Sequence, residues 1–237
     1  MALAAILSVE STGSFVNATD RGGNGVTGEG TSSIDWGNVA SGNFNSGYQF
    51  GGETLSTDNE GTFLLGTLTH RNGVIWKSNE TLVSTDLDID ISGTLAGQDF
   101  SVSETLSIDH IESLNSLSPC PYTNTSPCGD TVSFGLFDLF KFKVDLDGIS
   151  YLLKISGLFD NVDGSGEAVT GFATEEMAYS SAYLVGSLTM LEMETPPTTP
   201  PTTPPVTPIP LPAAGLLLIG AIGTLLFGRR RVSVQDH

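Results

Sequence analysis

Apolar and polar side chains alternate along much of the chain, at the two-residue period of a β-strand. The segment from Asp86 to Ile91 alternates strictly, which predicts that Leu87, Ile89 and Ile91 face a core while the aspartates between them face solvent. Similar stretches, rich in β-branched and aromatic residues, predict strands at residues 43–50, 61–69, 82–92, 99–111, 132–146, 149–157, 168–172 and 178–191.

Turn-forming pairs separate these stretches. Asn72-Gly73, Asp147-Gly148 and Asp163-Gly164 favour tight turns, because Asn, Asp and Gly accept a positive φ. Before the C-terminal region, no stretch has sustained helical periodicity. The pattern therefore predicts an all-β domain over residues 10–193, an antiparallel β-sandwich of jelly-roll type with eight to ten strands.

The first nine residues are small and apolar, and they resemble the end of the apolar region of a signal peptide. No basic residue precedes them, and the first positive charge is Arg21. We therefore interpret residues 1–9 as the remnant of a longer leader. A short ordered first strand is the alternative.

A proline-rich linker over residues 194–210 follows the predicted domain. Nine of the twelve prolines lie between Pro196 and Pro212. Proline fixes φ and lacks a backbone donor, so the segment is predicted to be an extended polyproline II stalk of roughly 50 Å. A passive linker is the simpler role, and a ligand for a proline-recognising domain is the alternative.

Residues 211–228 form an uncharged apolar segment, eighteen residues long. As a helix it would measure about 27 Å and could cross a thin bilayer. Arg229-Arg230-Arg231 follows directly, and the positive-inside rule predicts that residues 229–237 form a basic cytoplasmic tail. A buried core helix is the alternative, but neither a proline stalk nor an arginine triplet is expected beside one.

Charge narrows the classes of partner. The chain has 27 acidic and nine basic residues, and its formal net charge is −18. Nucleic acid is excluded as a partner, because phosphate binding requires clustered lysine and arginine. Surplus carboxylate keeps a protein soluble, and it disfavours contact with an anionic polysaccharide unless divalent cations bridge the two.

Cys120 and Cys128 are the two cysteines of the chain. In a chain that carries export signals, a pair eight residues apart predicts one disulfide that closes a loop. Half of a metal site is the alternative, but no nearby His or Cys completes four ligands.

Signatures of catalysis and metal binding are weak. The domain contains His70 and His110 but no Gly-x-Ser-x-Gly motif, so no catalytic residue is assigned and the chain is predicted not to be an enzyme. His70 is expected to be partly buried and to hold a turn through hydrogen bonds to neighbouring backbone. No cofactor is expected and no metal site is assigned. Asp160, Asp163 and Glu167 surround a glycine turn with hard oxygens suited to Ca²⁺, and an ordinary acidic turn is the simpler interpretation.

The C-terminal region resembles a known sorting signal. Ile209-Pro210-Leu211-Pro212-Ala213-Ala214, followed by the apolar segment and Arg229-Arg230-Arg231, is similar to the VPLPA-type PEP-CTERM tails, with Ile209 in place of Val. The resemblance implies an exosortase-like sorting transpeptidase as a partner, in a bacterium that makes exopolysaccharide. Leu211-Pro212-Ala213-Ala214-Gly215 also resembles a cell-wall sortase signal, but such a sortase attacks a threonine at the position of Ala214.

A second resemblance lies in the domain. Thr69-His70-Arg71-Asn72 ends a predicted strand, with Ile34-Asp35-Trp36-Gly37 upstream and the cysteine loop and Val132-Ser133-Phe134 downstream. Together these segments resemble the THxN family, also called the choice-of-anchor K domain, over residues 31–193. The resemblance implies a domain that occurs with different C-terminal anchors. It implies no activity for the motif residues Thr69, His70 and Asn72.

These features lead to three hypotheses. The first is a non-enzymatic protein exported to the cell envelope, the cell surface or the exopolysaccharide matrix, anchored by its C-terminal helix before or instead of cleavage. The second is an extracellular carbohydrate-binding or adhesion module that stacks sugar rings on Trp36, Tyr48, Trp76 and Tyr122. The third, a secreted hydrolase, requires two carboxylates, or a histidine beside a nucleophile, in one cleft.

Overall fold

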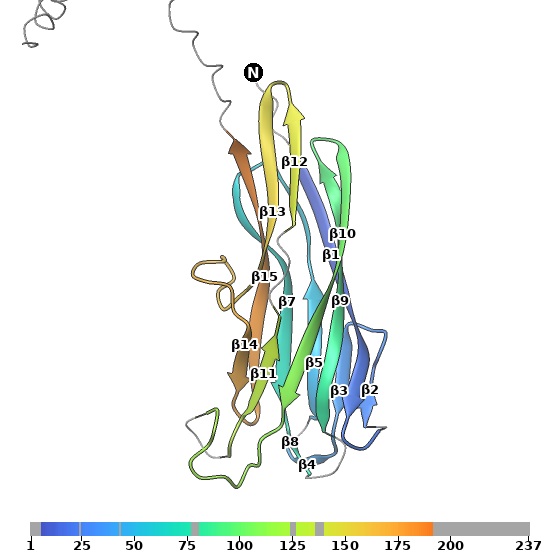
Figure 1. The fold of residues 1–237 in the computed structure, drawn as a ribbon, viewed down its shortest axis with the longest axis vertical. Coiled ribbons are helices and arrows are strands. Elements are labelled where there is room, and N and C mark those ends of the chain that lie inside the picture. Colours follow the sequence, from blue (N-terminus) through green and yellow to red (C-terminus); the bar gives the residue numbers. More distant parts are fainter. Residues whose placement is uncertain are drawn as a thin grey trace, which may run out of the picture. The chain divides into compact units, whose positions relative to one another are not determined.

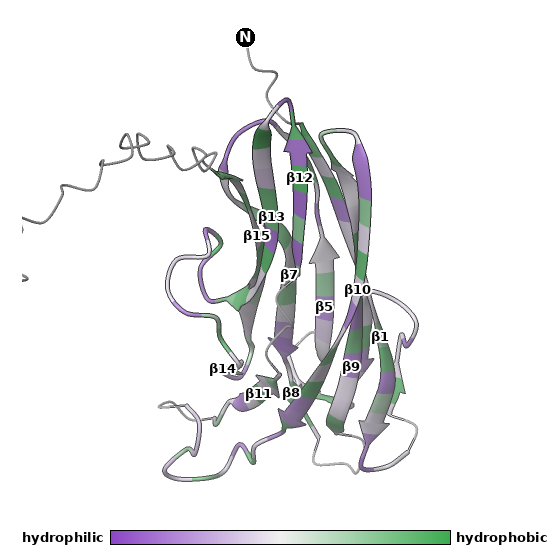
Figure 2. Cartoon of the chain, turned by 45° about the horizontal axis from the view of Figure 1, so that its top comes forward, coloured by the Kyte–Doolittle hydropathy of each residue, from purple (hydrophilic) through white to green (hydrophobic). Residues whose placement is uncertain are grey.

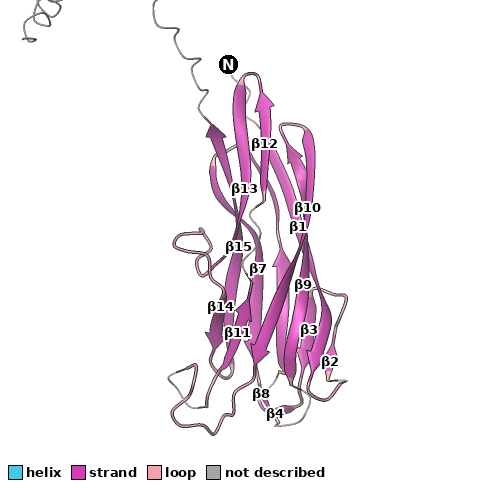
Figure 3. Cartoon of the chain, in the orientation of Figure 1, coloured by secondary structure: helices cyan, strands magenta, loops and turns pink. Residues whose placement is uncertain are grey.

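The computed structural model describes residues 6–23, 25–42, 44–76, 81–123, 127–135 and 140–191. The chain divides into two units, Met1–Met193 and Glu194–His237, and all described residues belong to the first. Every regular element among them is a strand, which confirms the all-β prediction for this unit (Figure 3). None of the described residues forms a helix of the length and apolar character that a membrane span requires. The predicted stalk, membrane helix, sorting motif and basic tail lie outside the described residues.

Two antiparallel sheets run along the long axis of this unit (Figure 1). The first sheet has six strands, in the order β14 (Gly171–Thr174), β11 (Asp130–Phe134), β10 (Gln98–Ile111), β9 (Leu82–Leu95), β1 (Leu7–Asp20) and β6 (Thr54–Thr57). The second sheet has seven, in the order β12 (Lys141–Leu146), β13 (Ile149–Phe159), β15 (Ala178–Leu191), β7 (Gly61–Asn72), β5 (Ser46–Gly52), β3 (Ser33–Trp36) and β2 (Val26–Thr27). The short strands β4 (Val39–Ser41) and β8 (Val74–Ile75) pair with each other.

The inner faces of the two sheets share one apolar core. Leu87, Ile89 and Ile91 of β9 have a relative exposure of 2% or less, as their alternation predicts. They belong to the same buried cluster as Leu68 of β7 and Leu184 of β15 in the opposite sheet. Hydrophobic and hydrophilic bands follow one another along β10 and β12 (Figure 2).

The outer face of the β9–β10 hairpin carries a row of polar pairs. Ser103, Thr105 and Ser107 on β10 donate hydrogen bonds to the carboxylates of β9 that stand opposite them. The acceptors are Asp90, Asp88 and Asp86, in that order. The alternation of β9 therefore fixes both a buried face and a register-specific polar face.

Residues 132–146 do not form the single strand that their pattern predicts. The chain makes β11 in the first sheet and β12 in the second, and residues 136–139 between them lie outside the described residues. Val132 and Phe134 of β11 and Val144 of β12 contribute to the core from opposite sheets. The described residues contain fifteen strands rather than eight to ten.

The first strand begins at Leu7, within the segment interpreted as a leader remnant. Leu7 and Val9 have relative exposures of 0% and 2%, and β1 pairs with β9 along most of its length. Residues 7–9 are thus an ordered part of the domain, which is the alternative named above, and residues 1–5 lie outside the described residues.

Candidate functional site

Five titratable side chains gather near one end of the two sheets. His70 comes from β7 and His110 from the end of β10, and Glu112 directly follows that strand. Asp130 begins β11, and Glu176 lies in the turn between β14 and β15. One ligand atom each of His70, His110 and Asp130 lies within 4.8 Å of the others, and the same holds for Glu112, Asp130 and Glu176. We refer to these five residues as the His–carboxylate cluster.

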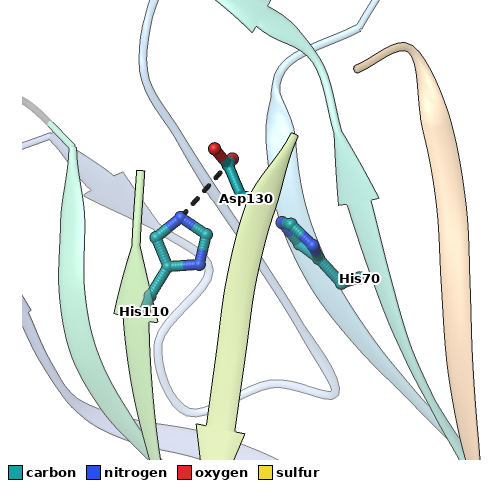
Figure 4. Close-up of side chains that lie close together, drawn as sticks. All are labelled: His70, His110 and Asp130. Carbon is teal, nitrogen blue, oxygen red and sulfur yellow. Dashed lines mark ion pairs between the residues drawn. The ribbon is translucent and has the colours of Figure 1, made fainter. Parts of the chain in front are cut away.

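Strand pairing brings the cluster together from both sheets. His70 lies on the inner face of β7, where Tyr48 of β5 is its cross-strand neighbour. Asp130 is paired with Thr174 of β14 in the first sheet. Figure 4 shows His70, His110 and Asp130 converging from three strands, with a dashed line between His110 and Asp130, whose Nε2 and Oδ2 lie 3.7 Å apart. The cluster therefore lies between the sheets.

Each histidine uses one ring nitrogen in a hydrogen bond to a hydroxyl group. Nδ1 of His70 is 2.9 Å from Oγ1 of Thr174, and Nδ1 of His110 is 2.8 Å from the hydroxyl oxygen of Tyr48. Nε2 of His70 is buried without a hydrogen-bond partner. Nε2 of His110 lies 3.5 Å from Oε2 of Glu112 and 3.7 Å from Oδ2 of Asp130.

Hydrogen bonds reach only some of the carboxylate oxygens in the cluster. Oδ1 of Asp130 accepts a hydrogen bond of 2.8 Å from the backbone N–H of Ser113, whereas its Oδ2 is buried without one. Both carboxylate oxygens of Glu176 are likewise buried and lack a hydrogen-bond partner. Within the described ranges, no lysine or arginine forms an ion pair with Glu112, Asp130 or Glu176. Unpartnered buried oxygens of this kind are costly unless a proton or a cation compensates them.

Burial keeps both histidines neutral. It lowers the pKa of His70 well below its ordinary value, and the neighbouring His110 and Arg71 act in the same direction. Burial also lowers the pKa of His110 to about 4, although the carboxylate of Asp130 opposes that change. Both rings therefore have a nitrogen lone pair at neutral pH.

The same burial favours protonation of the carboxylates. It raises the pKa of Asp130, and the negative charge of Glu112 adds to the effect. Burial raises the pKa of Glu112 as well, and a weaker hydrogen-bonding interaction with the Trp36 side chain opposes that rise. The pKa of Glu176 rises to about 7 for the same main reason. Three acidic groups that ordinarily ionise below pH 5 thus compete for protons near neutrality.

Aromatic side chains enclose the histidines. The ring of Trp36 stacks on that of His70 at 5.9 Å and meets that of His110 edge-on at 5.0 Å. Tyr48 lies 5.0 Å from His70. Trp36 and Tyr48 each have a relative exposure of 1%, so the prediction that these two stack sugar rings at the surface is wrong.

The Thr-His-x-Asn segment connects the two sheets. His70 and Asn72 both contact Thr174, since Nδ2 of Asn72 donates to its carbonyl oxygen at 3.1 Å. The expectation that a partly buried His70 bonds neighbouring backbone is wrong, because the side chain has no exposure and bonds across the core. Thr69 faces away from the cluster, with Oγ1 2.9 Å from the hydroxyl oxygen of Ser181 on β15.

Cys120 and Cys128 form a disulfide, as predicted. The carbonyl oxygen of Cys128 accepts a 2.8 Å hydrogen bond from the hydroxyl of Ser113. The backbone N–H of the same serine bonds Asp130. The disulfide loop therefore supports one wall of the cluster.

Asp160, Asp163 and Glu167 lie exposed in the connection between β13 and β14. Asp160 accepts a hydrogen bond of 2.8 Å from the side chain of Asn161, and Asp163 accepts one of 2.9 Å from the backbone of Ser165. In the described part of the chain, neither residue group with metal-binding geometry includes them. These contacts are those of an acidic turn.

Comparison with known proteins gives no match: no family model fits the chain, and no curated protein is significantly similar to it. The resemblances to the THxN family and to PEP-CTERM tails stay predictions. The cluster was missed at the sequence level because its members are distant in the chain. The one local signal was the two-residue spacing of His110 and Glu112 at the end of a predicted strand, which places them on the same side of the chain where the extended backbone continues.

Proposed function

We propose that this protein is an exported, non-catalytic domain displayed at the bacterial cell envelope or in an exopolysaccharide matrix. An exosortase-like transpeptidase recognises its C-terminal tail, and the apolar segment anchors the chain in the membrane before or instead of cleavage. The order of segments in the sequence carries the proposal: a folded unit, a proline-rich stretch, an apolar stretch, then Arg229-Arg230-Arg231.

Three structural features support the proposal. The Cys120–Cys128 disulfide fits an oxidising compartment outside the cytoplasm. The reactive side chains that come together, His70, His110 and Asp130, are each 96% or more buried, which leaves a substrate no route to them. The two facing antiparallel sheets support a jelly-roll-type sandwich as the displayed body.

The test is fractionation of the native host followed by intact-mass measurement. We expect the protein in the envelope or matrix fraction, either with a mass that ends near Pro212 or as the full chain in the membrane. Replacing Pro210, Leu211 and Pro212 by alanine should abolish cleavage or sorting, whereas replacing Pro200 and Pro201 in the stalk should not. A full-length chain in the cytoplasmic fraction would refute the proposal.

Carbohydrate binding is the second candidate, because two of the nominated aromatic side chains are exposed. Trp76 follows β8 with a relative exposure of 63%, and Tyr122 lies in the disulfide loop with 44%. A glycan array probed with the full chain and with Trp76→Ala tests it, with Tyr179→Ala as the control for loss of an exposed aromatic. Binding that depends on Trp76 but not on Tyr179 supports the candidate, and no selective binding removes it.

A further inference from the structure

We propose that the His–carboxylate cluster is a structural site for one divalent transition-metal ion, with Zn²⁺ as the best-matched occupant, which cross-links the two sheets. Its ligands are Nε2 of His70, Nε2 of His110, Oδ2 of Asp130 and Oε2 of Glu112. Glu176 lies beside them as an additional acceptor. This proposal is independent of the proposed function, because it concerns the domain and not its C-terminal tail.

The donor set selects the class of ion. Two neutral imidazoles with two carboxylates are a nitrogen and oxygen set, which Zn²⁺ and its first-row neighbours bind well. Ca²⁺ and Mg²⁺ prefer sites made of oxygen alone. Two carboxylates also balance the charge of a divalent ion in a site where no lysine or arginine of the described residues pairs with them.

The distances fit a single ion. Two ligand atoms about 2.1 Å from a tetrahedrally bound ion lie about 3.4 Å apart. Nε2 of His110 is 3.5 Å from Glu112 and 3.7 Å from Asp130, which is close to that separation. One ligand atom each of His70, His110 and Asp130 lies within 4.8 Å of the others, so these three residues form the centre of the proposed site. Glu112 joins it through its contact with His110.

The surrounding hydrogen bonds orient the ligands as in known metal sites. A metal-binding histidine donates its second N–H to an acceptor, which fixes the ring and leaves the other nitrogen free. Here Thr174 and Tyr48 supply hydroxyl oxygens to Nδ1 of His70 and of His110. Ser113 similarly holds Oδ1 of Asp130, so that Oδ2 stays available.

Burial assigns the ion a structural role. Relative exposures are 0% for His70 and Asp130 and 4% for His110, and the side chain of Glu112 is 12% exposed, so protein surrounds most of the proposed coordination sphere, as in structural metal sites. His70 belongs to the second sheet, and the other ligands belong to the first sheet or its end. The ion therefore closes the interface between the sheets.

The test uses the full chain in detergent, stripped with EDTA and then titrated with ZnCl₂. We expect one equivalent of bound zinc by mass spectrometry of the metal and a rise in Tm of about 10 °C. CaCl₂ and MgCl₂ at the same concentration are run in parallel and should give no rise. Absence of zinc binding, or a rise with Ca²⁺ alone, would overturn the assignment.

Variants locate the ion. His110→Gln and Asp130→Asn should each weaken zinc binding by more than about 100-fold, whereas Asp163→Asn and His237→Gln should leave it unchanged. Zinc affinity that survives the first two substitutions contradicts the site. If those variants do not fold, X-ray absorption of the zinc-loaded wild type decides: two imidazole ligands support the site, and none or one refutes it. The chain has only three histidines, so His237→Gln identifies any contribution from the tail.

Discussion

Thr174 shows how one small residue can hold a site that spans two sheets. Its hydroxyl contacts His70 and its carbonyl accepts from Asn72, both from β7, while its own strand pairs it with Asp130. The side chain has no exposure, so both hydrogen bonds are shielded from water. The motif histidine and asparagine thus act through a threonine about a hundred residues away.

Thr174→Val tests this arrangement at the level of one hydroxyl group. Valine keeps the shape but removes the acceptor for Nδ1 of His70, so zinc affinity should fall about 10- to 100-fold. Isothermal titration of the EDTA-treated chain with ZnCl₂ measures it. Thr12→Val, an exposed threonine of β1, is the matched control. Equal affinities for the two variants would show that Thr174 does not orient a ligand.

The titratable groups give the metal-free protein a distinctive pH dependence. The pKa of His110 is lowered to about 4, so the contribution of the neutral ring to the free energy of unfolding is lost as pH falls from about 6.5 towards 4. The pKa of Glu176 is raised to about 7, and the pKa values of Glu112 and Asp130 are raised too. The contribution of these protonated carboxyls is therefore lost as pH rises. Among these four groups, it is the carboxylates that still titrate above pH 6.5.

We therefore expect the Tm of the EDTA-treated chain to fall as pH rises from 6.5 to 8. Glu112→Gln should flatten that slope, because the amide has no proton to lose. Zinc should reverse the trend, since a cation displaces protons from its ligands and binds more tightly at higher pH. Thermal melts at half-unit intervals measure all three curves. A metal-free Tm that rises across this range would be inconsistent with buried carboxylates.

At the scale of elements, two-residue turns set the hairpins. Asp147-Gly148 joins β12 to β13 with φ of 50° and 81°, as the Asp-Gly pair predicts. Ala96-Gly97 joins β9 to β10 with φ of 51° and 77°, although alanine disfavours the left-handed region. The second turn was not predicted because its sequence lacks Asn or Asp.

Ala96→Asn should therefore stabilise the domain. Asparagine tolerates the left-handed conformation and makes the Asn-Gly pair that this turn type prefers, with an expected gain of about 1 kcal/mol. Urea denaturation of the EDTA-treated chain measures it. Gly97→Ala is the opposite control, since a Cβ at φ 77° is strained even though it meets no neighbour. A gain from both substitutions would mean that backbone strain is not the cause.

The strands differ in how far their sequence predicts them. Between Asp86 and Ile91 the alternation of β9 gave both faces correctly, because each inward position of that stretch is apolar. In β1 the inward series includes Ser11, which is 5% exposed and donates to the carbonyl of Leu65, so the apolar period is interrupted. A buried hydroxyl with a partner in the other sheet is invisible in the pattern of one strand. The cluster was hidden for the same reason: its members meet only through pairing between distant strands.

At the scale of the whole molecule, the net charge of −18 opposes compaction. Asp86, Asp88 and Asp90 along β9 illustrate this charge repulsion, because three carboxylates lie in a row on one outer face. Neutral hydroxyls, which cannot offset the charge, are their hydrogen-bond partners across the hairpin. The same charge is the reason we expect no nucleic-acid partner, and it also predicts how the domain responds to salt.

Raising NaCl from 20 mM to 500 mM should raise the Tm by about 2–5 °C, because screening reduces repulsion between surface carboxylates. Melts at fixed pH in EDTA measure the effect. Choline chloride at equal ionic strength should give the same rise, since screening does not depend on the identity of the cation. A rise with NaCl alone would indicate specific ion binding instead.

The Cys120–Cys128 disulfide bears on the order in which the proposed export, disulfide formation and metal loading would occur. Ser113 connects the closed loop to Asp130, so the proposed ligand set would be complete only once the thiols are oxidised. If the chain is exported as proposed, it would leave a reducing cytoplasm with the loop open and with a weaker affinity for the ion. Loading would then follow export, and the domain would acquire its rigidity only where it is to be used.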